Sequence, residues 1–466
     1  MRGALAVRVL RLAAAAGIVL LAAAGCATLP DSDALIERHT AQAARFESAR
    51  GALTERQNAA VLAGLKGKSG DIDILEKQIV LEQSINDSPL TLGNKVTLLK
   101  DGAQTYPAMF AAIRNAKDHV NLETFIIEDD EVGQEFAKLL LEQQRRGVQI
   151  NMIYDSVGAI STPKAYFDRL IEGGVQVLEF NPVNPVSVVM PWMLNNRDHR
   201  KLLVVDGRTV FLGGINISSV YTSGSVVKRN AEPGGNTSPW RDTDLRIEGP
   251  VVGEFQKLFL ETWQKQKGKP LAQKQYFPPL KAEGKDIVRA VGSTPDDPFS
   301  LMYLTLISAI GNAQKQVYLT NAYFVPDAQL LKALTDAAGR GVDVKLILPS
   351  HTDSQTAFHA GRSHYEELLK AGVKIHERRG ALLHAKTAVV DGVWSTVGSS
   401  NLDWRSALDN NEVNAVVLGR EFAQQMLAMF AADLAVSDEI DAARWERRSP
   451  ALRFKEWMAR VWGRML

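Results

Sequence analysis

The sequence contains almost no cysteine. Cys26 is the only one among 466 residues, which excludes an intrachain disulfide and any metal site built from cysteine pairs. An excess of charge of one sign is also missing, because 54 lysines and arginines balance 53 aspartates and glutamates. This balance argues against a strongly basic surface for nucleic acid, although it leaves room for a local basic pocket.

The N-terminal region lacks an apolar run of membrane-spanning length. Its apolar stretch, Leu12–Gly25, has 14 residues, fewer than the roughly 20 that a helix needs to cross a bilayer. Arginines precede this stretch and small residues lead from it to Cys26, which is the arrangement of a secretory signal. The sequence therefore predicts a signal peptide over residues 1–25.

The only cysteine follows this signal directly. The residues "AAGC" that end at Cys26 resemble the lipobox of bacterial lipoproteins, in which the cysteine is lipidated and becomes the new N-terminus. The resemblance predicts a lipid anchor on Cys26 and a mature protein that faces the periplasm. The outer membrane is slightly favoured, because Ala27 is not acidic. An uncleaved anchor, or a signal with an incidental cysteine, is the alternative.

One pattern occurs twice in the chain. "HRKLLVVDGRTVFLGGIN" begins at His199, and "HAKTAVVDGVWSTVGSSN" begins at His384. Further similar segments flank both copies, at offsets between 185 and 198 residues. Such steady offsets indicate one duplicated domain. The pattern aligns the following pairs without a gap: His199 with His384, Lys201 with Lys386, Asp206 with Asp391, and Asn216 with Asn401.

Each copy alternates between two periodicities. "HVNLETFII" and "VQINMIYD" are typical of strands, whereas "EVGQEFAKLLLEQQRRG" has the apolar spacing of a helix. This alternation predicts an α/β fold with a mainly parallel sheet. We expect two tandem repeats, packed about a pseudo-two-fold axis with one shared active site. The predicted segments are a helical arm or linker at 26–85, repeats at 86–275 and 276–440, and an amphipathic tail at 441–466.

The repeated side chains suit phosphodiester chemistry. Histidine and lysine stand two residues apart on a strand in each copy, so both point to one face. Two lysines can neutralise a phosphate, while one histidine attacks phosphorus and the other protonates the leaving oxygen. The asparagines of the pattern, Asn216 and Asn401, can add amide donors. Each histidine also needs a carboxylate to fix its tautomer, and the candidates are Asp242 and Glu412, with Asp242 expected to serve His199 of its own repeat.

The aspartates of the repeated pattern, Asp206 and Asp391, are expected to have a structural role. Asp206 and Asp391 precede glycines, and an aspartate in that position commonly braces a turn. We therefore expect them to support the loop without touching substrate. No metal and no cofactor are predicted, because a lysine between prospective ligands repels a cation and no HExxH motif is present.

The duplicated pattern resembles the phospholipase D superfamily, and within it the bacterial cardiolipin synthases. The segments "NNRDHRKLLVVDG", "WRDTDLRIEGP" and "LLHAKTAVVDG" carry the resemblance, which runs from about Pro89 to Arg420. It implies two α/β repeats around one metal-independent site. By this resemblance His199 is the nucleophile that forms a phosphohistidine, and His384 is the general acid and then base. The remaining catalytic and supporting residues are Lys201, Asp206, Asn216, Asp242, Lys386, Asp391, Asn401 and Glu412.

The implied reaction moves a phosphatidyl group to a phosphatidylglycerol acceptor. The alternatives are hydrolysis to phosphatidic acid and, less favoured, cleavage of nucleic acid. The expected partners are membrane phospholipids, namely phosphatidylglycerol and as a second candidate phosphatidylethanolamine, with no nucleic acid and with a functional monomer. Two apolar stretches agree with a membrane substrate, although core packing explains them equally well. One surrounds Trp192, and the other spaces Trp457, Val461 and Leu466 among basic residues, as an interfacial helix would.

Overall fold

The computed structural model describes residues 44–66, 78–80, 82–83, 85, 88–183, 195–222, 239–297, 300–461 and 463. The predicted signal peptide, Cys26, Trp192 and Leu466 lie outside these ranges. Within them, no helix combines the length and the apolar character needed to span a bilayer.

The first repeat forms a mixed sheet. Its central strands β4 (His119–Thr124), β5 (Gln149–Asp155) and β6 (Gln176–Phe180) pair in parallel. On the other side of β4 the pairing is antiparallel, in the order β8 (Lys201–Val205), β9 (Thr209–Gly213), β11 (Thr243–Glu248) and β3 (Leu90–Lys100).

The second repeat has the same strand order. Parallel strands β13 (Gln316–Asn321), β14 (Asp343–Pro349) and β15 (Lys374–Arg378) are followed, on the other side of β13, by antiparallel strands β17 (Lys386–Val390), β18 (Trp394–Gly398), β19 (Asn410–Leu418) and β12 (Asp286–Ser293). β20 (Ser437–Glu439) extends the outer edge beside β15. β3 pairs with β12 and joins the two sheets. The predicted duplication is confirmed.

The prediction of a mainly parallel sheet is wrong. Crossover helices join the parallel neighbours, as α6 (Glu131–Arg145) and α7 (Lys164–Glu172) do in the first repeat and α10 (Ala328–Gly339) and α12 (Tyr365–Lys370) in the second. The motif strands are instead joined by tight turns into hairpins. A hairpin connection makes neighbouring strands antiparallel, whereas parallel pairing needs a longer crossover.

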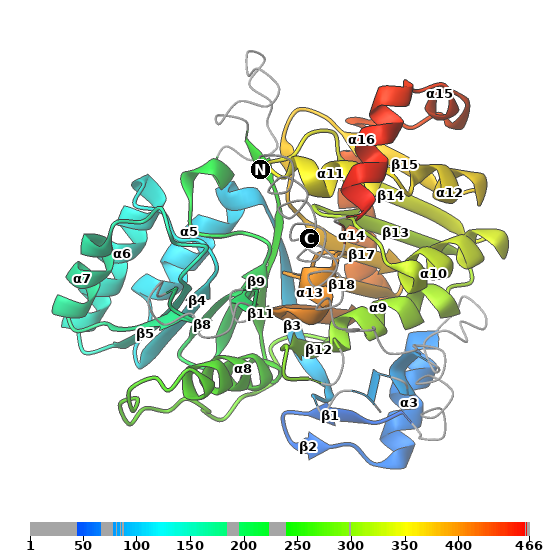
Figure 1. Cartoon of the computed structure of the whole chain (residues 1–466). Helices are drawn as coiled ribbons and strands as arrows, with labels where there is room; N and C mark the ends of the chain where they lie inside the picture. Colours follow the sequence, from blue (N-terminus) through cyan, green and yellow to red (C-terminus); the bar gives the residue numbers. More distant parts are fainter. Residues whose placement is uncertain are drawn as a thin grey trace, which may run out of the picture. The chain divides into compact units, whose positions relative to one another are not determined.

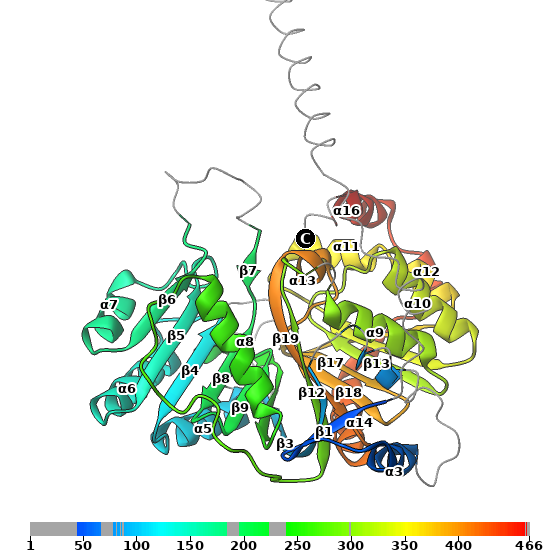
Figure 2. The same ribbon diagram turned by 90° about the horizontal axis from the view of Figure 1, so that it is seen from below.

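Helices cover both faces of the first sheet. Side chains of β8 alternate, because Leu203 and Val205 pack with α5 (Asp101–Arg114) and α6, whereas Leu202 and Val204 pack with α8 (Val252–Lys265). Figure 2 shows α8 lying across β8 and β9. The core on the α8 side also takes in side chains of β18, β19 and α14 (Arg420–Leu434). The two repeats therefore share the hydrophobic core on the α8 side of the sheet.

The chain before β3 is only partly helical. It forms β1 (Phe46–Ser48), β2 (Gly51–Ala52) and α3 (Glu55–Lys66), and β1 pairs in parallel with β3 (Figure 1). Phe46 is buried, and Glu82 forms a buried ion pair of 3.4 Å with Arg289. These residues therefore join the sheet and the core of the second repeat, and the assignment of 26–85 as a helical arm or linker stays a prediction.

Candidate active site

Two short strand pairings connect the motifs across the repeats. β7 (Arg197–Asp198) pairs in parallel with the start of β19, and β10 (Trp240–Arg241) pairs in parallel with β16 (Leu382–Leu383). The His199 N–H donates to Asn411 O over 3.0 Å, and the His384 N–H donates to Arg241 O over 2.8 Å. The same contact is thus made twice with the repeats exchanged, as the predicted pseudo-two-fold axis requires.

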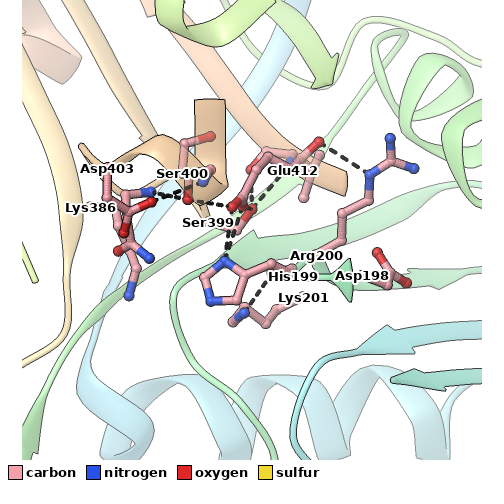
Figure 3. A network of polar contacts seen from close by, with 12 residues as sticks. Asp198, His199, Arg200, Lys201, Lys386, Ser399, Ser400, Asp403 and Glu412 are labelled. Atoms are coloured by element: carbon pink, nitrogen blue, oxygen red, sulfur yellow. Dashed lines mark hydrogen bonds and ion pairs between the residues drawn. The ribbon is translucent and has the colours of Figure 1, made fainter. Parts of the chain in front are cut away.

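The carboxylates that hold the histidines come from the opposite repeat. His199 Nδ1 lies 3.0 Å from Glu412 Oε1 (Figure 3), and His384 Nδ1 lies 2.7 Å from Asp242 Oδ2. The expectation that Asp242 orients His199 is therefore wrong. The inter-repeat pairing explains the exchange, because the backbone partner of each histidine is the residue directly before the other repeat's carboxylate.

Glu412 is fixed by serines that the sequence reasoning did not single out. Ser399 Oγ and Ser406 Oγ donate to its two carboxylate oxygens, the latter over 2.7 Å. In the first repeat the position of Ser399 is taken by Gly214, where a Cβ atom would come within 2.2 Å of Asp242 Oδ1. Glycine in the first motif thus goes with the shorter aspartate, and serine in the second motif goes with the longer glutamate. The Gly/Ser mismatch in the aligned motifs was the signal that could have revealed the role of Ser399.

Arg200 is a third residue to which the motif analysis gave no role. It alternates with His199 and Lys201 on the strand, so it points away from their face. Its Nε donates to Glu412 O over 3.1 Å, and one guanidinium nitrogen donates to Thr262 Oγ1 over 2.8 Å (Figure 3). Arg200 therefore ties the backbone of the β19 carboxylate to α8.

Both lysines lie folded back on their own histidines. Lys201 Nζ donates to His199 O over 2.5 Å. Lys386 Nζ donates to His384 O and lies 2.9 Å from His384 Nδ1. Burial, together with the nearby Lys386 ammonium, lowers the pKa of Lys201 to about 7, and burial lowers the pKa of Lys386 to about 8. A phosphate bound here would favour the charged forms, because an opposite charge stabilises the ammonium.

The two histidines line one cavity of about 280 Å³, together with both motif asparagines. Aromatic rings form part of its wall, with Phe125 at 5.1 Å from the His199 ring and Trp240 at 5.0 Å from the His384 ring. Burial lowers the pKa of His199 to about 4 in spite of the neighbouring Glu412 carboxylate. Burial and the Lys386 ammonium lower the pKa of His384 as well. The site without substrate therefore disfavours the imidazolium form of both side chains.

The two asparagines differ in their surroundings. Asn216 Nδ2 donates to Tyr221 Oη over 3.0 Å, and its Oδ1 accepts the Ile126 N–H over 3.1 Å. Asn401 Oδ1 is buried, and no hydrogen-bond partner for it is found within the described part of the chain. Tyr221 Oη in turn lies 3.5 Å from His384 Nδ1. The part of the cavity around His384 is thus more crowded with side chains than the part around His199.

Asp206 and Asp391 do not reach the cavity. Asp206 accepts the backbone N–H groups of residues 117–119, and Asp391 accepts those of residues 314–316. Both have a positive φ, 53° and 52°, in the turns after β8 and β17. Each aspartate lies five positions after its motif lysine along an extended strand, which corresponds to roughly 16 Å. Their placement among the catalytic residues is therefore corrected to the turn-bracing role.

The structure thus brings eight of the predicted residues together: His199, Lys201, Asn216, Asp242, His384, Lys386, Asn401 and Glu412. Their catalytic roles stay predictions. Among the described residues, no three or more His, Cys, Asp or Glu side chains are grouped as metal ligands.

Comparisons with known proteins agree with this geometry. The family model described as "Cardiolipin synthase, PLD-like domain" matches residues 109–232 and 306–434. A cardiolipin synthase of Geobacillus sp. (strain WCH70) is 33% identical over 82% of this chain and 74% of its own length. A cardiolipin synthase of Listeria monocytogenes serotype 4a is 33% identical over 81% of this chain and 77% of its own length.

A solved structure shares the fold. Phosphatidylserine synthase of Haemophilus influenzae aligns with a TM-score of 0.59 and 14% identity, over 83% of this chain and 99% of its own. At that identity the likeness concerns the fold alone. The family model and the sequence relatives carry the assignment, and by them the chain belongs to the cardiolipin synthase family of phospholipase D-like proteins.

Proposed function

We propose that this protein transfers a phosphatidyl group from a phospholipid donor to phosphatidylglycerol, forming cardiolipin. The observation that carries the proposal is the single cavity in which two histidines each face a carboxylate of the other repeat. Two buried lysines beside them supply the positive charge for a phosphodiester. The similarity to proteins named cardiolipin synthase supports the choice of lipid donor and acceptor.

The hydrogen bonds favour His199 as the nucleophile. Its Nδ1 contacts only carboxylate oxygens, so Nδ1–H donates to Glu412 and Nε2 keeps a lone pair. His384 Nδ1 instead meets both Asp242 and the Lys386 ammonium. The general acid is the protonated form of His384, whose Nδ1–H donates to Asp242 and whose Nε2–H faces the leaving oxygen, and a bound phosphate favours this charged form.

The reaction then proceeds by two displacements. His199 Nε2 attacks phosphorus, the bond from phosphorus to the head-group oxygen breaks, and His384 gives that oxygen its proton. The hydroxyl of phosphatidylglycerol next loses its proton to His384 and attacks phosphorus, and the P–N bond breaks to free His199. Both lysines, with Asn216 and Asn401, hold the phosphate oxygens. Lys201 and Lys386 provide the charge that a metal ion supplies elsewhere.

The product assay tests this proposal. Purified full-length protein is incubated with labelled phosphatidylglycerol vesicles in excess chelator, with and without phosphatidylethanolamine. We expect cardiolipin and the released head group at an undiminished rate, because no step needs a metal. Phosphatidic acid as the main product would instead show a hydrolase. Activity that chelator abolishes and added metal restores would overturn the mechanism.

We also propose that the mature protein is a lipoprotein on the periplasmic side of the membrane, anchored through Cys26. The basic start, the short apolar stretch and the position of the only cysteine support this reading. Mass spectrometry of the mature N-terminus is expected to find a chain that begins at an acylated Cys26. With Cys26→Ser as the control, acylation should disappear. An intact Met1, or an unmodified Cys26 in the mature chain, would contradict the proposal.

A further inference from the structure

The C-terminal helix α16 (Pro450–Val461) exposes an unusual set of large apolar side chains. Phe454 is 61% exposed, Trp457 58%, Met458 40% and Val461 61%. With spacings of three and four residues they lie within roughly 100° of one another around the helix. We call these four residues the α16 stripe. Solvent-exposed apolar residues are normally scattered singly, so this grouping requires a covering partner.

The other side of α16 is packed against the second repeat. Ala459 packs with Ala357 and Ala360 of α11 (Gln355–Arg362), and Figure 1 shows α16 beside α11. The buried Glu456 is held by Arg448 over 2.9 Å. These contacts hold α16 in place. The α16 stripe, on the other side of the helix, therefore faces away from the second repeat.

The helix stands close to the catalytic cavity. Ala357, which packs with Ala459, itself lines the cavity that contains both histidines. Tyr323 packs on the same small cluster, and its ring centroid is 6.2 Å from that of His384. One layer of side chains therefore separates α16 from the site.

The charges beside the α16 stripe indicate which kind of surface can cover it. Arg453 and Arg460 lie on one flank of the stripe, Lys455 lies on the other, and all three are exposed. Glu456 is the only acidic residue of the helix, and it is buried. An apolar face between basic flanks matches the boundary between the acyl chains and the anionic head groups of a bilayer.

We infer that the α16 stripe inserts into the surface of a bilayer that contains anionic phospholipid, and so holds the catalytic cavity beside its substrate. This inference rests on the proposed function, because a lipid donor explains why a membrane contact adjoins this cavity. The contact is separate from the Cys26 anchor. The anchor would limit the protein to a membrane, whereas α16 would set the orientation of the cavity toward it.

A fluorescent label tests insertion directly. Full-length protein with Cys26→Ser and Trp457→Cys carries a single thiol for an environment-sensitive dye. We expect the emission to shift to shorter wavelength on vesicles containing phosphatidylglycerol, and quenchers attached to acyl chains to reduce it. Phe277→Cys is the matched control, because Phe277 is an equally exposed aromatic residue, 60% exposed, that does not line the cavity. Its dye should remain in water.

Two results would overturn the inference. A dye at position 457 that stays in water on these vesicles shows that the stripe does not insert. A dye that is already shielded before vesicles are added shows that a protein surface, either residues 1–43 or a second copy, covers the stripe.

A kinetic measurement separates this inference from the proposed function. The double variant Trp457→Asp, Val461→Asp should raise KM for vesicle lipid roughly 100-fold, because the loss of each buried side chain costs about one tenfold step in membrane affinity. It should leave turnover of a dissolved short-chain donor and the melting temperature unchanged, as should Phe277→Asp for both donors. If the proposed function fails, the unmodified protein either consumes neither donor or releases phosphatidic acid in place of cardiolipin. If only docking fails, both donors are consumed and the double variant behaves normally.

Discussion

His199→Ala is expected to form no covalent intermediate with any donor, and to lower kcat by roughly 10⁴-fold or more. In the proposed mechanism phosphorus becomes bonded to His199 Nε2, and alanine offers no atom that could take its place. A donor with a good leaving group, such as a p-nitrophenyl phosphatidyl ester, should not rescue this variant. Single-turnover release of p-nitrophenol measures the first step.

His384→Ala is the informative comparison. It should be slow with a natural lipid by roughly 10²- to 10⁴-fold, because the leaving alkoxide then departs without a proton. With the p-nitrophenyl donor, which needs little protonation, it should keep a first-turnover burst. The second step still lacks its base, so the phosphatidyl group should accumulate and be trapped on His199. A trapped group on His384 would reverse the two roles, and a burst without any trapped histidine would exclude the double displacement.

The second large effect on activity is expected from the carboxylates, because each one contacts the histidine of the other repeat. Glu412→Gln should reduce the burst with the p-nitrophenyl donor by roughly 10²- to 10⁴-fold, because it removes the acceptor that fixes the His199 tautomer. Asp242→Asn should leave this burst nearly intact and should slow the natural donor and the second step. A pairing within each repeat would give the opposite pattern.

A double-mutant cycle makes the pairing quantitative. Glu412→Gln added to His199→Ala should cost little more, because the carboxylate acts through that histidine alone. Added to His384→Ala, it should cost nearly its full effect. Asp409→Asn is the matched control, since this partly buried carboxylate lies just before β19 and contacts neither histidine. Equal additivity with both histidines would contradict the crossed arrangement.

Much of the fold could be predicted because the local spacing of apolar residues determines which side chains of a strand or helix enter the core. The alternating pattern of β8 places Leu203 and Val205 on one face and Leu202 and Val204 on the other, and each set enters a different core. The duplicated motif predicted the pairing of equivalent residues in one site. It did not predict the mixed sheet, because a hydrophobic strand has the same pattern beside a parallel or an antiparallel neighbour.

The sequence by itself determined which side chains meet in the candidate site: two histidines, two lysines and two asparagines, each pair 185 residues apart, and two carboxylates 170 residues apart. Only the tertiary structure decided which carboxylate serves which histidine, since the answer lies in the inter-repeat pairings of β7 with β19 and β10 with β16. It likewise decided the burial that keeps His199 neutral and brings the lysine pKa values down to about 7 and 8. The physical reason is the same in both cases. A motif fixes the spacing of atoms along one strand. Hydrogen-bond partners and desolvation are instead set by residues 213 and 142 positions away, which the folded repeats bring to 3.0 and 2.7 Å.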